Sequence, residues 1–238
     1  MIICRIKMKR RSTKHRQLEL DLRRHGGARA GAGRKRAGPR RRVPHTTRPV
    51  VKPRFPLHVT VRVGRELPGL RNFELAAALQ RAFVRGCVKD GFRICQFSIQ
   101  GNHAHLICEA HDSASLATGM QGWAVRVARG LNRKLGRTGR VFDDRYHAET
   151  VTTPQQMRHV LCYVLQNARR HGARLDPRWH GADPFSSAWW FDGWSDDRWR
   201  RGLAPADECP VARARTWLLE TGWRRHRLIG VDEVPRVA

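Results

Sequence analysis

Residues 92–109 read FRICQFSIQGNHAHLICE, a pattern that predicts two strands joined by a tight turn at Gly101-Asn102. Because strand side chains alternate between two faces, His103 and His105 must project from the same side of the sheet. The opposite side then receives the residues that alternate with them: Ala104, Leu106 and Cys108. This hairpin therefore combines an apolar face with two candidate metal ligands.

The segments before and after the hairpin fit the same kind of fold. Leu57–Val63 alternates between apolar and polar residues and predicts a half-buried strand. Leu70–Lys89 has apolar residues at helical spacing and predicts a helix, which Asp90-Gly91 would end. After the hairpin, an apolar stripe indicates a second helix: Leu116, Met120, Trp123, Val127 and Leu131.

A short strand or hairpin is expected within Val141–Val151, followed by a third helix from about Pro154 to His171. The start of this helix is well marked, because Thr153 can cap it and Gln156 can complete a capping box. The predicted order is β-α-β-β-α-β-α. We therefore expect an α+β fold, a ferredoxin-like sheet with helices packed on it.

The composition favours a nucleic-acid partner. The 238 residues include 47 Lys and Arg against 20 Asp and Glu, which gives a formal charge of +27. Such an excess favours a polyanion, and nucleic acid more than an acidic membrane. No apolar run is long enough to span a bilayer and no convincing signal peptide is present, so we expect a cytoplasmic or nucleoid-associated protein without a membrane partner.

Three regions are expected along the chain. Residues 1–54 are rich in Gly, Arg and Pro and lack apolar periodicity, which predicts a disordered basic arm. Residues 55–175 contain the predicted sheet and helices. Residues 176–238 hold most of the tryptophans, interleaved with arginines. These rings either stack unpaired bases or, as we favour, anchor the extension on the domain.

The six cysteines occur singly, without a C-x-x-C pair. Most of them lie in apolar helix or strand patterns. We therefore expect small buried residues in a reducing compartment, and neither a disulfide framework nor a zinc cluster.

Tyr163 and Asn167 lie one turn apart on the third predicted helix, just beyond the edge of its apolar stripe. A tyrosine hydroxyl, with an ordinary pKa of about 10, is a poor nucleophile near neutral pH, so attack on a phosphodiester needs a positive centre nearby. A divalent metal held by His103, His105 and a third ligand would supply one, and Asn167 is placed to be that ligand. The only other tyrosine, Tyr146, has no amide ligand in register.

These residues resemble a known family. Asn102–Ile107 resembles the histidine–hydrophobic–histidine motif of the HUH single-tyrosine transposases, and Tyr163–Arg169 is similar to the tyrosine helix of their REP-associated branch. Phe55–Thr60 resembles the opening strand of the family. Asp183–Ser187 resembles a segment often found after the tyrosine helix, so the resemblance covers about residues 55–195.

The resemblance implies a metal-dependent endonuclease and strand transferase that acts on single-stranded or hairpin DNA through a transient 5′-phosphotyrosine link. By motif position, Tyr163 is the nucleophile, while His103, His105 and Asn167 hold the metal. An oxygen-rich phosphate substrate and an amide ligand favour Mg²⁺ or Mn²⁺ over zinc. The chain is expected to act as a monomer or a homodimer.

Some assignments have alternatives. The family commonly has proline after the asparagine, whereas Ala168 follows here, and other branches use glutamine, which keeps Gln166 as a weaker candidate ligand. A non-catalytic DNA- or RNA-binding protein, or a domesticated nuclease that processes palindromes, would also fit the sequence. Five arginines are candidate contacts to DNA phosphates or, equally, ordinary exposed side chains: Arg126, Arg129, Arg133, Arg169 and Arg170.

Overall fold

The structure, a computed structural model, describes residues 50–170, 182–196, 199 and 208–235. The predicted basic arm lies outside the described residues except for 50–54. Within that stretch Val51 is only 7% exposed and belongs to the hydrophobic core. Its backbone N–H donates to Ser113 Oγ at 3.2 Å. Val51, which the sequence analysis assigned to the basic arm, therefore packs on the domain.

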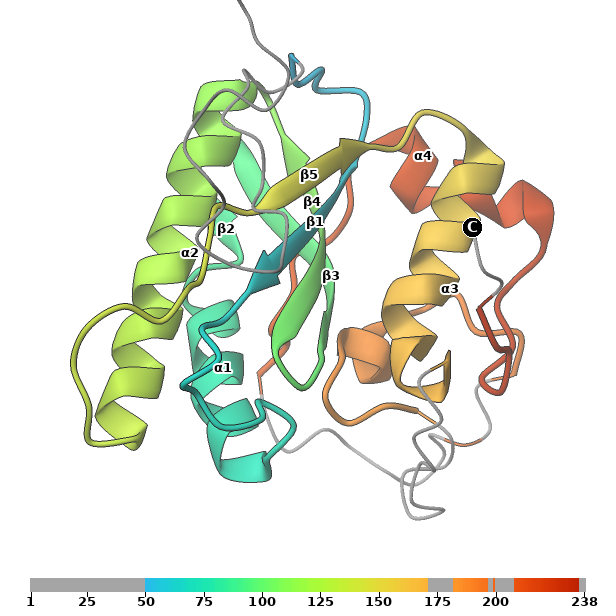
Figure 1. The fold of residues 1–238 in the computed structure, drawn as a ribbon. Helices are drawn as coiled ribbons and strands as arrows, with labels where there is room; N and C mark the ends of the chain where they lie inside the picture. The colour runs from blue at the N-terminus through green and yellow to red at the C-terminus, as the bar shows by residue number, and fades with distance from the viewer. Residues whose placement is uncertain (1–49, 171–181, 197–198, 200–207, 236–238) are drawn as a thin grey trace, which may run out of the picture. The chain divides into compact units, whose positions relative to one another are not determined.

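Five strands form one sheet in the order β2-β3-β4-β1-β5, and every neighbouring pair is antiparallel (Figure 1). The hairpin of residues 92–109 forms β3 and β4, and β1 lies between β4 and β5. This is the predicted α+β, ferredoxin-like arrangement with one additional short strand, β2. The strand bounds are β1 Leu57–Arg62, β2 Val88–Lys89, β3 Phe92–Ile99, β4 His103–Ala110 and β5 His147–Thr150.

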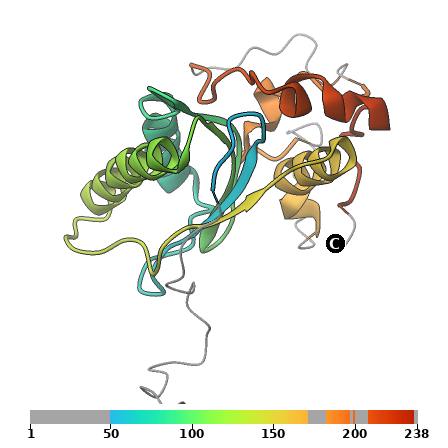
Figure 2. The ribbon, with the colours of Figure 1, turned by 90° about the horizontal axis from the view of Figure 1, so that it is seen from above.

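Helices cover both faces of the sheet (Figures 1 and 2). Helices α1 (Phe73–Val84) and α2 (Ser113–Lys134) pack on one face, and α3 (Pro154–Arg170) packs on the other. The predicted cap of α3 is confirmed, because Thr153 Oγ1 accepts a hydrogen bond from the backbone N–H of Gln156 at 3.2 Å. None of the described helices combines the length and the apolar character needed to cross a membrane.

Each face of the sheet has its own apolar cluster. The cluster under α1 and α2 contains the alternate residues of β1 and β4 together with the predicted stripe of α2: Leu57, Val59, Val61, Ala104, Leu106, Cys108, Leu116, Met120, Trp123, Val127 and Leu131. The cluster under α3 takes fewer sheet residues, Cys95 and Ile107, and joins them to Met157, Leu161, Cys162, Val164 and Leu165. The α3 face of the sheet therefore leaves part of its surface to polar residues.

The first helix is shorter than its apolar spacing predicts. It ends at Val84, and Val88–Lys89 forms a strand, so the prediction of a helix up to Lys89 is wrong. Asp90-Gly91 is the turn between β2 and β3, where Gly91 has a φ of +68°. Asp-Gly between paired residues is a strong hairpin signal, and here it outweighed the helical spacing of the residues before it.

The outer edge of β3 is covered by the segment Asp183–Ser187. The backbone N–H of Ile99 donates to Phe185 O at 2.7 Å, and the N–H of Phe97 donates to Ser187 Oγ at 2.9 Å. Asp183 has a fully buried carboxylate that receives both guanidinium nitrogens of Arg71 at 2.9 Å. These bonds satisfy a sheet edge that would otherwise expose unpaired backbone groups.

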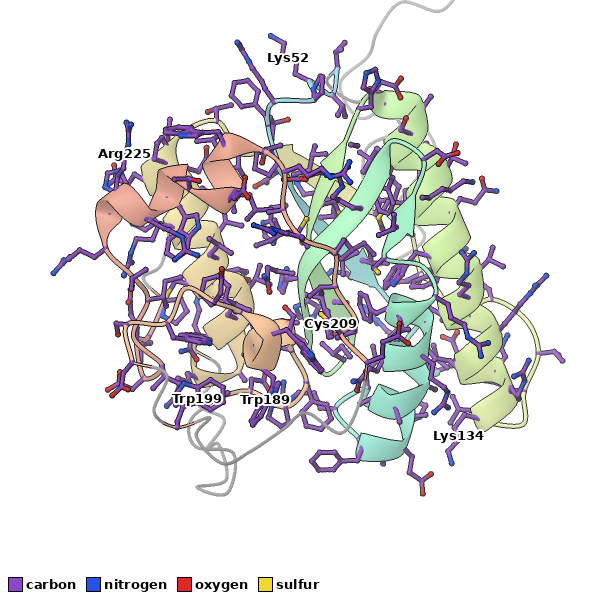
Figure 3. The ribbon with its side chains drawn as sticks, turned by 180° about the vertical axis from the view of Figure 1, so that it is seen from behind. Lys52, Lys134, Trp189, Trp199, Cys209 and Arg225 are labelled. Carbon is purple, nitrogen blue, oxygen red and sulfur yellow. The ribbon has the colours of Figure 1, made fainter. Side chains whose placement is uncertain are left out.

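The C-terminal extension packs against α3. Its described residues form three short helices, η2 (Ser187–Trp190), α4 (Trp217–Glu220) and η4 (Gly222–His226). Trp194 and Trp223 are buried in the cluster under α3, which supports the anchoring interpretation for these two rings. Figure 3 labels two further rings, Trp189 and Trp199, whose centroids lie 5.3 Å apart in an edge-on contact.

Candidate active site

Polar side chains of β1 and β4 occupy the α3 face of the sheet. Because Thr60 pairs with His105 and Arg62 pairs with His103 across the two strands, these residues project from the same face. His58 lies two positions before Thr60 on β1 and shares that face. The alternation predicted for His103 and His105 is therefore confirmed, and a third histidine from β1 joins them.

The structure brings the two predicted histidines and the predicted tyrosine together. The Nε2 atoms of His103 and His105 lie 3.1 Å apart. The hydroxyl oxygen of Tyr163 lies 3.4 Å from His105 Nε2, and the two ring centroids are 5.0 Å apart at an interplanar angle of 75°. Helix α3 achieves this because its apolar side chains pack on Ile107, the next residue of β4 on the same face.

The second nitrogen of each histidine also has a partner. His103 Nδ1 lies 2.9 Å from Asn102 Oδ1. His105 Nδ1 lies 3.2 Å from His58 Nε2 and 3.2 Å from Thr60 Oγ1. Both imidazoles are thus held at Nδ1 and present Nε2 to the same point.

His58 was not predicted to belong to this site. The sequence places it on a strand, but its proximity to His105 follows only from the pairing of β1 with β4, which no local pattern in β1 reveals. Burial lowers the pKa of His58 below its ordinary value; the charge of Glu149 opposes this shift and that of His147 adds to it. The imidazole is therefore predominantly neutral near neutral pH.

Asn167 lies in the last turn of α3, just after an irregular residue. Gln166 has φ −115° and ψ 16°, which kinks the helix at that point. The side chain of Asn167 is fully buried, and neither of its amide atoms makes a hydrogen bond to a described residue. A buried amide without partners costs free energy, and the role of Asn167 as a metal ligand stays a prediction.

Gln166, the weaker candidate ligand, is engaged elsewhere. Its Nε2 donates to the backbone carbonyls of Gly230, at 3.1 Å, and Val231, and its Oε1 accepts from Arg169 Nε at 3.2 Å. The amide therefore joins α3 to the C-terminal extension. Of the two neighbouring side-chain amides, Gln166 is thus occupied by hydrogen bonds, whereas that of Asn167 is not.

The five candidate arginines divide between the two sides of the sheet. The guanidinium carbon of Arg170 lies 5.3 Å from the centre of the Tyr163 ring, and Arg169 lies beside it on α3. Three others are on α2, which packs on the opposite face of the sheet, and their side chains are exposed: Arg126, Arg129 and Arg133. Arg170 thus contacts the predicted nucleophile, and DNA binding by all five stays a prediction.

Tyr146, the other tyrosine of the chain, packs against the cluster under α1 and α2. It is thus separated by the sheet from His103 and His105, which face α3. The placement favours Tyr163 as the reactive phenol.

The donor atoms suit a divalent cation. Two nitrogens that each lie about 2.1 Å from one cation, at right angles, are about 3.0 Å apart, close to the 3.1 Å between the two Nε2 atoms. Among the described residues, no group of three or more His, Cys, Asp and Glu side chains is arranged to hold a metal. Asn167, whose amide has no hydrogen-bond partner among the described residues, stays the predicted third ligand.

Comparison with known proteins places this site in a family. Residues 56–167 match the family model described as transposase, IS200 like. A solved structure of the REP-associated tyrosine transposase bound to a REP hairpin is 16% identical, covering 73% of this chain and 99% of that chain, with a TM-score of 0.48. A protein from Deinococcus radiodurans R1 named as a candidate transposase is 14% identical, covering 41% and 78%, with a TM-score of 0.35.

No curated protein matches the chain. Both solved structures have TM-scores below 0.5, so the family assignment rests on the sequence match alone. That match spans β1 and most of α3 and includes all four predicted site residues, His103, His105, Tyr163 and Asn167. Residues 56–167, which carry them, are therefore similar to the IS200-like transposase family.

Proposed function

We propose that this chain is a single-tyrosine HUH transposase that cleaves and rejoins single-stranded or hairpin DNA through a 5′-phosphotyrosine intermediate. The proposal rests on one observation above all: the hydroxyl oxygen of Tyr163 lies 3.4 Å from His105 Nε2, which itself lies 3.1 Å from His103 Nε2. A nucleophile and two metal-binding nitrogens converge on one point although they come from a late helix and an early hairpin.

The metal site would consist of His103 Nε2, His105 Nε2 and the amide oxygen of Asn167. A hard cation, Mg²⁺ or Mn²⁺, suits the phosphate oxygens of the substrate and the amide ligand. When bound, such a cation polarises the scissile phosphate and stabilises the negative charge that develops in the transition state.

The chain's own groups then carry the bond changes. The oxygen of Tyr163 attacks the phosphorus and forms a new P–O bond, its proton passing to water, while the bond from phosphorus to the 3′ oxygen breaks. The released 3′ oxygen takes up a proton and leaves as a hydroxyl. A 3′-hydroxyl that attacks the phosphotyrosine reverses these steps and rejoins the strands.

Arg170 is the arginine best placed to hold the substrate phosphate near Tyr163. The carbon of its guanidinium lies over the phenol ring, 5.3 Å from the ring centre. A planar guanidinium can bind two phosphate oxygens at once, which would orient the phosphorus for attack. The strong positive charge of the whole chain would add affinity for the DNA backbone without reading its sequence.

The first prediction tests the nucleophile. The full chain is incubated with a pool of DNA hairpins carrying randomised single-stranded flanks and a label at the 3′ end, in the presence of Mg²⁺ or Mn²⁺. The labelled fragment should remain attached to the wild-type protein in a denaturing gel. Tyr163→Phe should lower adduct formation by about 1,000-fold or more, because the attacking oxygen is gone.

The matched control is Tyr146→Phe, which removes the other phenol and should leave the adduct in place. A persistent adduct in the Tyr163→Phe protein contradicts the assignment of the nucleophile. Metal-independent binding of the hairpins by the wild-type chain, without any cleavage, contradicts the catalytic proposal and favours a nucleic-acid-binding protein.

A further inference from the structure

The far side of His105 from the proposed metal site has an unusual partner. His105 Nδ1 lies 3.2 Å from Nε2 of His58, a second imidazole, and the two ring centroids are 5.2 Å apart. The ring of His58 also lies edge-on to Tyr163, with centroids 5.8 Å apart. His58 therefore contacts both a proposed ligand, His105, and the proposed nucleophile, Tyr163.

The chemistry of an imidazole ligand makes this contact significant. A histidine binds a metal through a nitrogen that carries no proton, so the proton of the neutral ring must sit on the other nitrogen. For His105 to bind through Nε2, its Nδ1 must be an N–H group, and this group needs a hydrogen-bond acceptor. Two atoms lie within hydrogen-bond distance of it, His58 Nε2 and Thr60 Oγ1.

We propose that His58 is a positioning residue of this site: its Nε2 accepts the Nδ1–H of His105 and so holds the unprotonated Nε2 of His105 toward His103 and Tyr163. This inference rests on the proposed function, since it gives the metal site its orienting group. His58 itself does not bind the metal.

The two ligands are held in different ways. His103 is held by Asn102, its own neighbour in the exposed turn between β3 and β4. His105 is held from the adjacent strand β1, where His58 is fixed by the antiparallel ladder between Leu57–Arg62 and His103–Cys108. The imidazole of His58 is thus set by the sheet itself, which makes it the more rigid of the two supports.

The test is the affinity of the full chain for Mn²⁺ alone, followed by electron paramagnetic resonance of the free ion. His58→Leu, which removes the acceptor, should weaken Mn²⁺ binding by about 10–100-fold, the usual cost of losing an outer partner of a ligating histidine. His58→Gln places an amide oxygen where Nε2 was and should recover most of the affinity. Recovery by glutamine would not be expected if His58 served only to fill space.

His147→Gln is the matched control. His147 lies on β5 opposite Thr60, on the same face of the sheet, but its Nε2 bonds to Glu149 at 2.9 Å and its side chain is 55% exposed. This variant should bind Mn²⁺ like the wild type. An equal loss in the His147→Gln and His58→Leu proteins would overturn the proposal, because it would indicate a general effect of the histidine cluster.

A second readout reports the proton directly. Nitrogen-15 NMR of the histidine side chains, with and without excess Mg²⁺, should show the His105 proton on Nδ1 in the wild type and on Nε2, or shared, in His58→Leu. An unchanged His105 proton position together with unchanged Mn²⁺ affinity overturns the role of His58. A wild-type chain that binds no metal overturns the proposed function instead, and the NMR comparison without metal then still decides the role of His58.

Discussion

The two faces of the sheet are built from the same strands and serve different purposes. On β4, Leu106 is completely buried under α1 and α2, while His105, one residue earlier, faces α3 and contacts Tyr163. The first face is apolar along its whole length. The second is apolar only where α3 and the C-terminal extension cover it, and beyond Ile107 it becomes polar. Stability is therefore concentrated on one face, which leaves the other free to carry chemistry.

The largest expected effect is a difference in the free energy of unfolding between variants of two neighbouring residues on β4, Leu106 and His105. Leu106→Ala removes a fully buried side chain and should lower the free energy of unfolding by about 3–5 kcal/mol. His105→Ala should lower it by only about 1 kcal/mol, because it removes hydrogen bonds within a polar cluster. Urea unfolding of both variants measures the difference.

In an activity assay the same two variants should show the opposite ranking, with His105→Ala the more impaired. At temperatures where both proteins are folded, His105→Ala should lose the labelled DNA adduct and Leu106→Ala should retain it. If His105→Ala proves as destabilising as Leu106→Ala, the division of labour between the faces is wrong.

A somewhat smaller effect is expected at the edge of the sheet. Asp183→Ala removes a fully buried carboxylate and leaves the guanidinium of Arg71 without its acidic partner, which should cost about 3 kcal/mol since Arg71 is only partly exposed. Asp192→Ala is the control, because Asp192 is 85% exposed in its ion pair with Arg224 and should cost less than about 1 kcal/mol. Equal costs in urea unfolding would show that the Asp183–Ser187 segment does not hold the edge of β3.

Features encoded within a single element could be predicted from the sequence. The alternation of His103 and His105, the stripe of α2 and the cap at Thr153 are local patterns, and the structure has each of them. The contact between Tyr163 and His105 spans two elements, and the motif resemblance supplied it. The end of α1 was misjudged because helical spacing and a hairpin turn compete within the same stretch.

What the sequence could not indicate are contacts set by long-range pairing. The position of His58 depends on the register between β1 and β4, and the Arg71–Asp183 pair joins residues 112 positions apart. The same holds for Gln166, whose bonds to the backbone of Gly230 and Val231 exclude it as a free ligand. A polar residue reveals its partner only when the fold is known.

A third, modest effect concerns how the α3 face is covered. Arg158 on α3 holds Glu233 of the C-terminal extension through two bonds of 2.8 Å. These bonds keep the pKa of Glu233 below its ordinary value, against the opposing effect of its partial burial. Because the pair lies near the surface, Glu233→Gln should lower the free energy of unfolding near neutral pH by at most about 1 kcal/mol.

The pH dependence of this contribution has a definite sign. Since the pKa of Glu233 is lower in the folded chain than in the unfolded chain, its contribution is complete above the unfolded value and is lost as the pH falls through the folded value. The unfolding free energies of wild type and Glu233→Gln should therefore converge on going from about pH 7 to about pH 3. A constant difference across that range would mean that the carboxylate does not support the extension.

The last prediction concerns no change in stability. It compares the two faces of the sheet by the reactivity of their cysteine thiols. Cys108 lies in the cluster under α1 and α2, Cys162 lies in the cluster under α3, and both are buried, whereas Cys209 is exposed. Burial raises the pKa of Cys108 well above its ordinary value and that of Cys162 to about 12. A thiol reagent at neutral pH should therefore label Cys209 rapidly and the other two only on unfolding.

Cys209→Ser identifies the fast thiol, and the experiment is done on a Cys4→Ser background because Cys4 lies outside the described residues. Slow labelling of both Cys108 and Cys162 would mean that the apolar part of the α3 face is as tightly closed as the opposite face. The polar residues His103 and His105 would then be surrounded by tightly packed apolar residues, as an active site requires. Rapid labelling of Cys162 alone would mean that α3 and the C-terminal extension separate from the sheet, and the difference between the faces would then be one of stability as well as of chemistry.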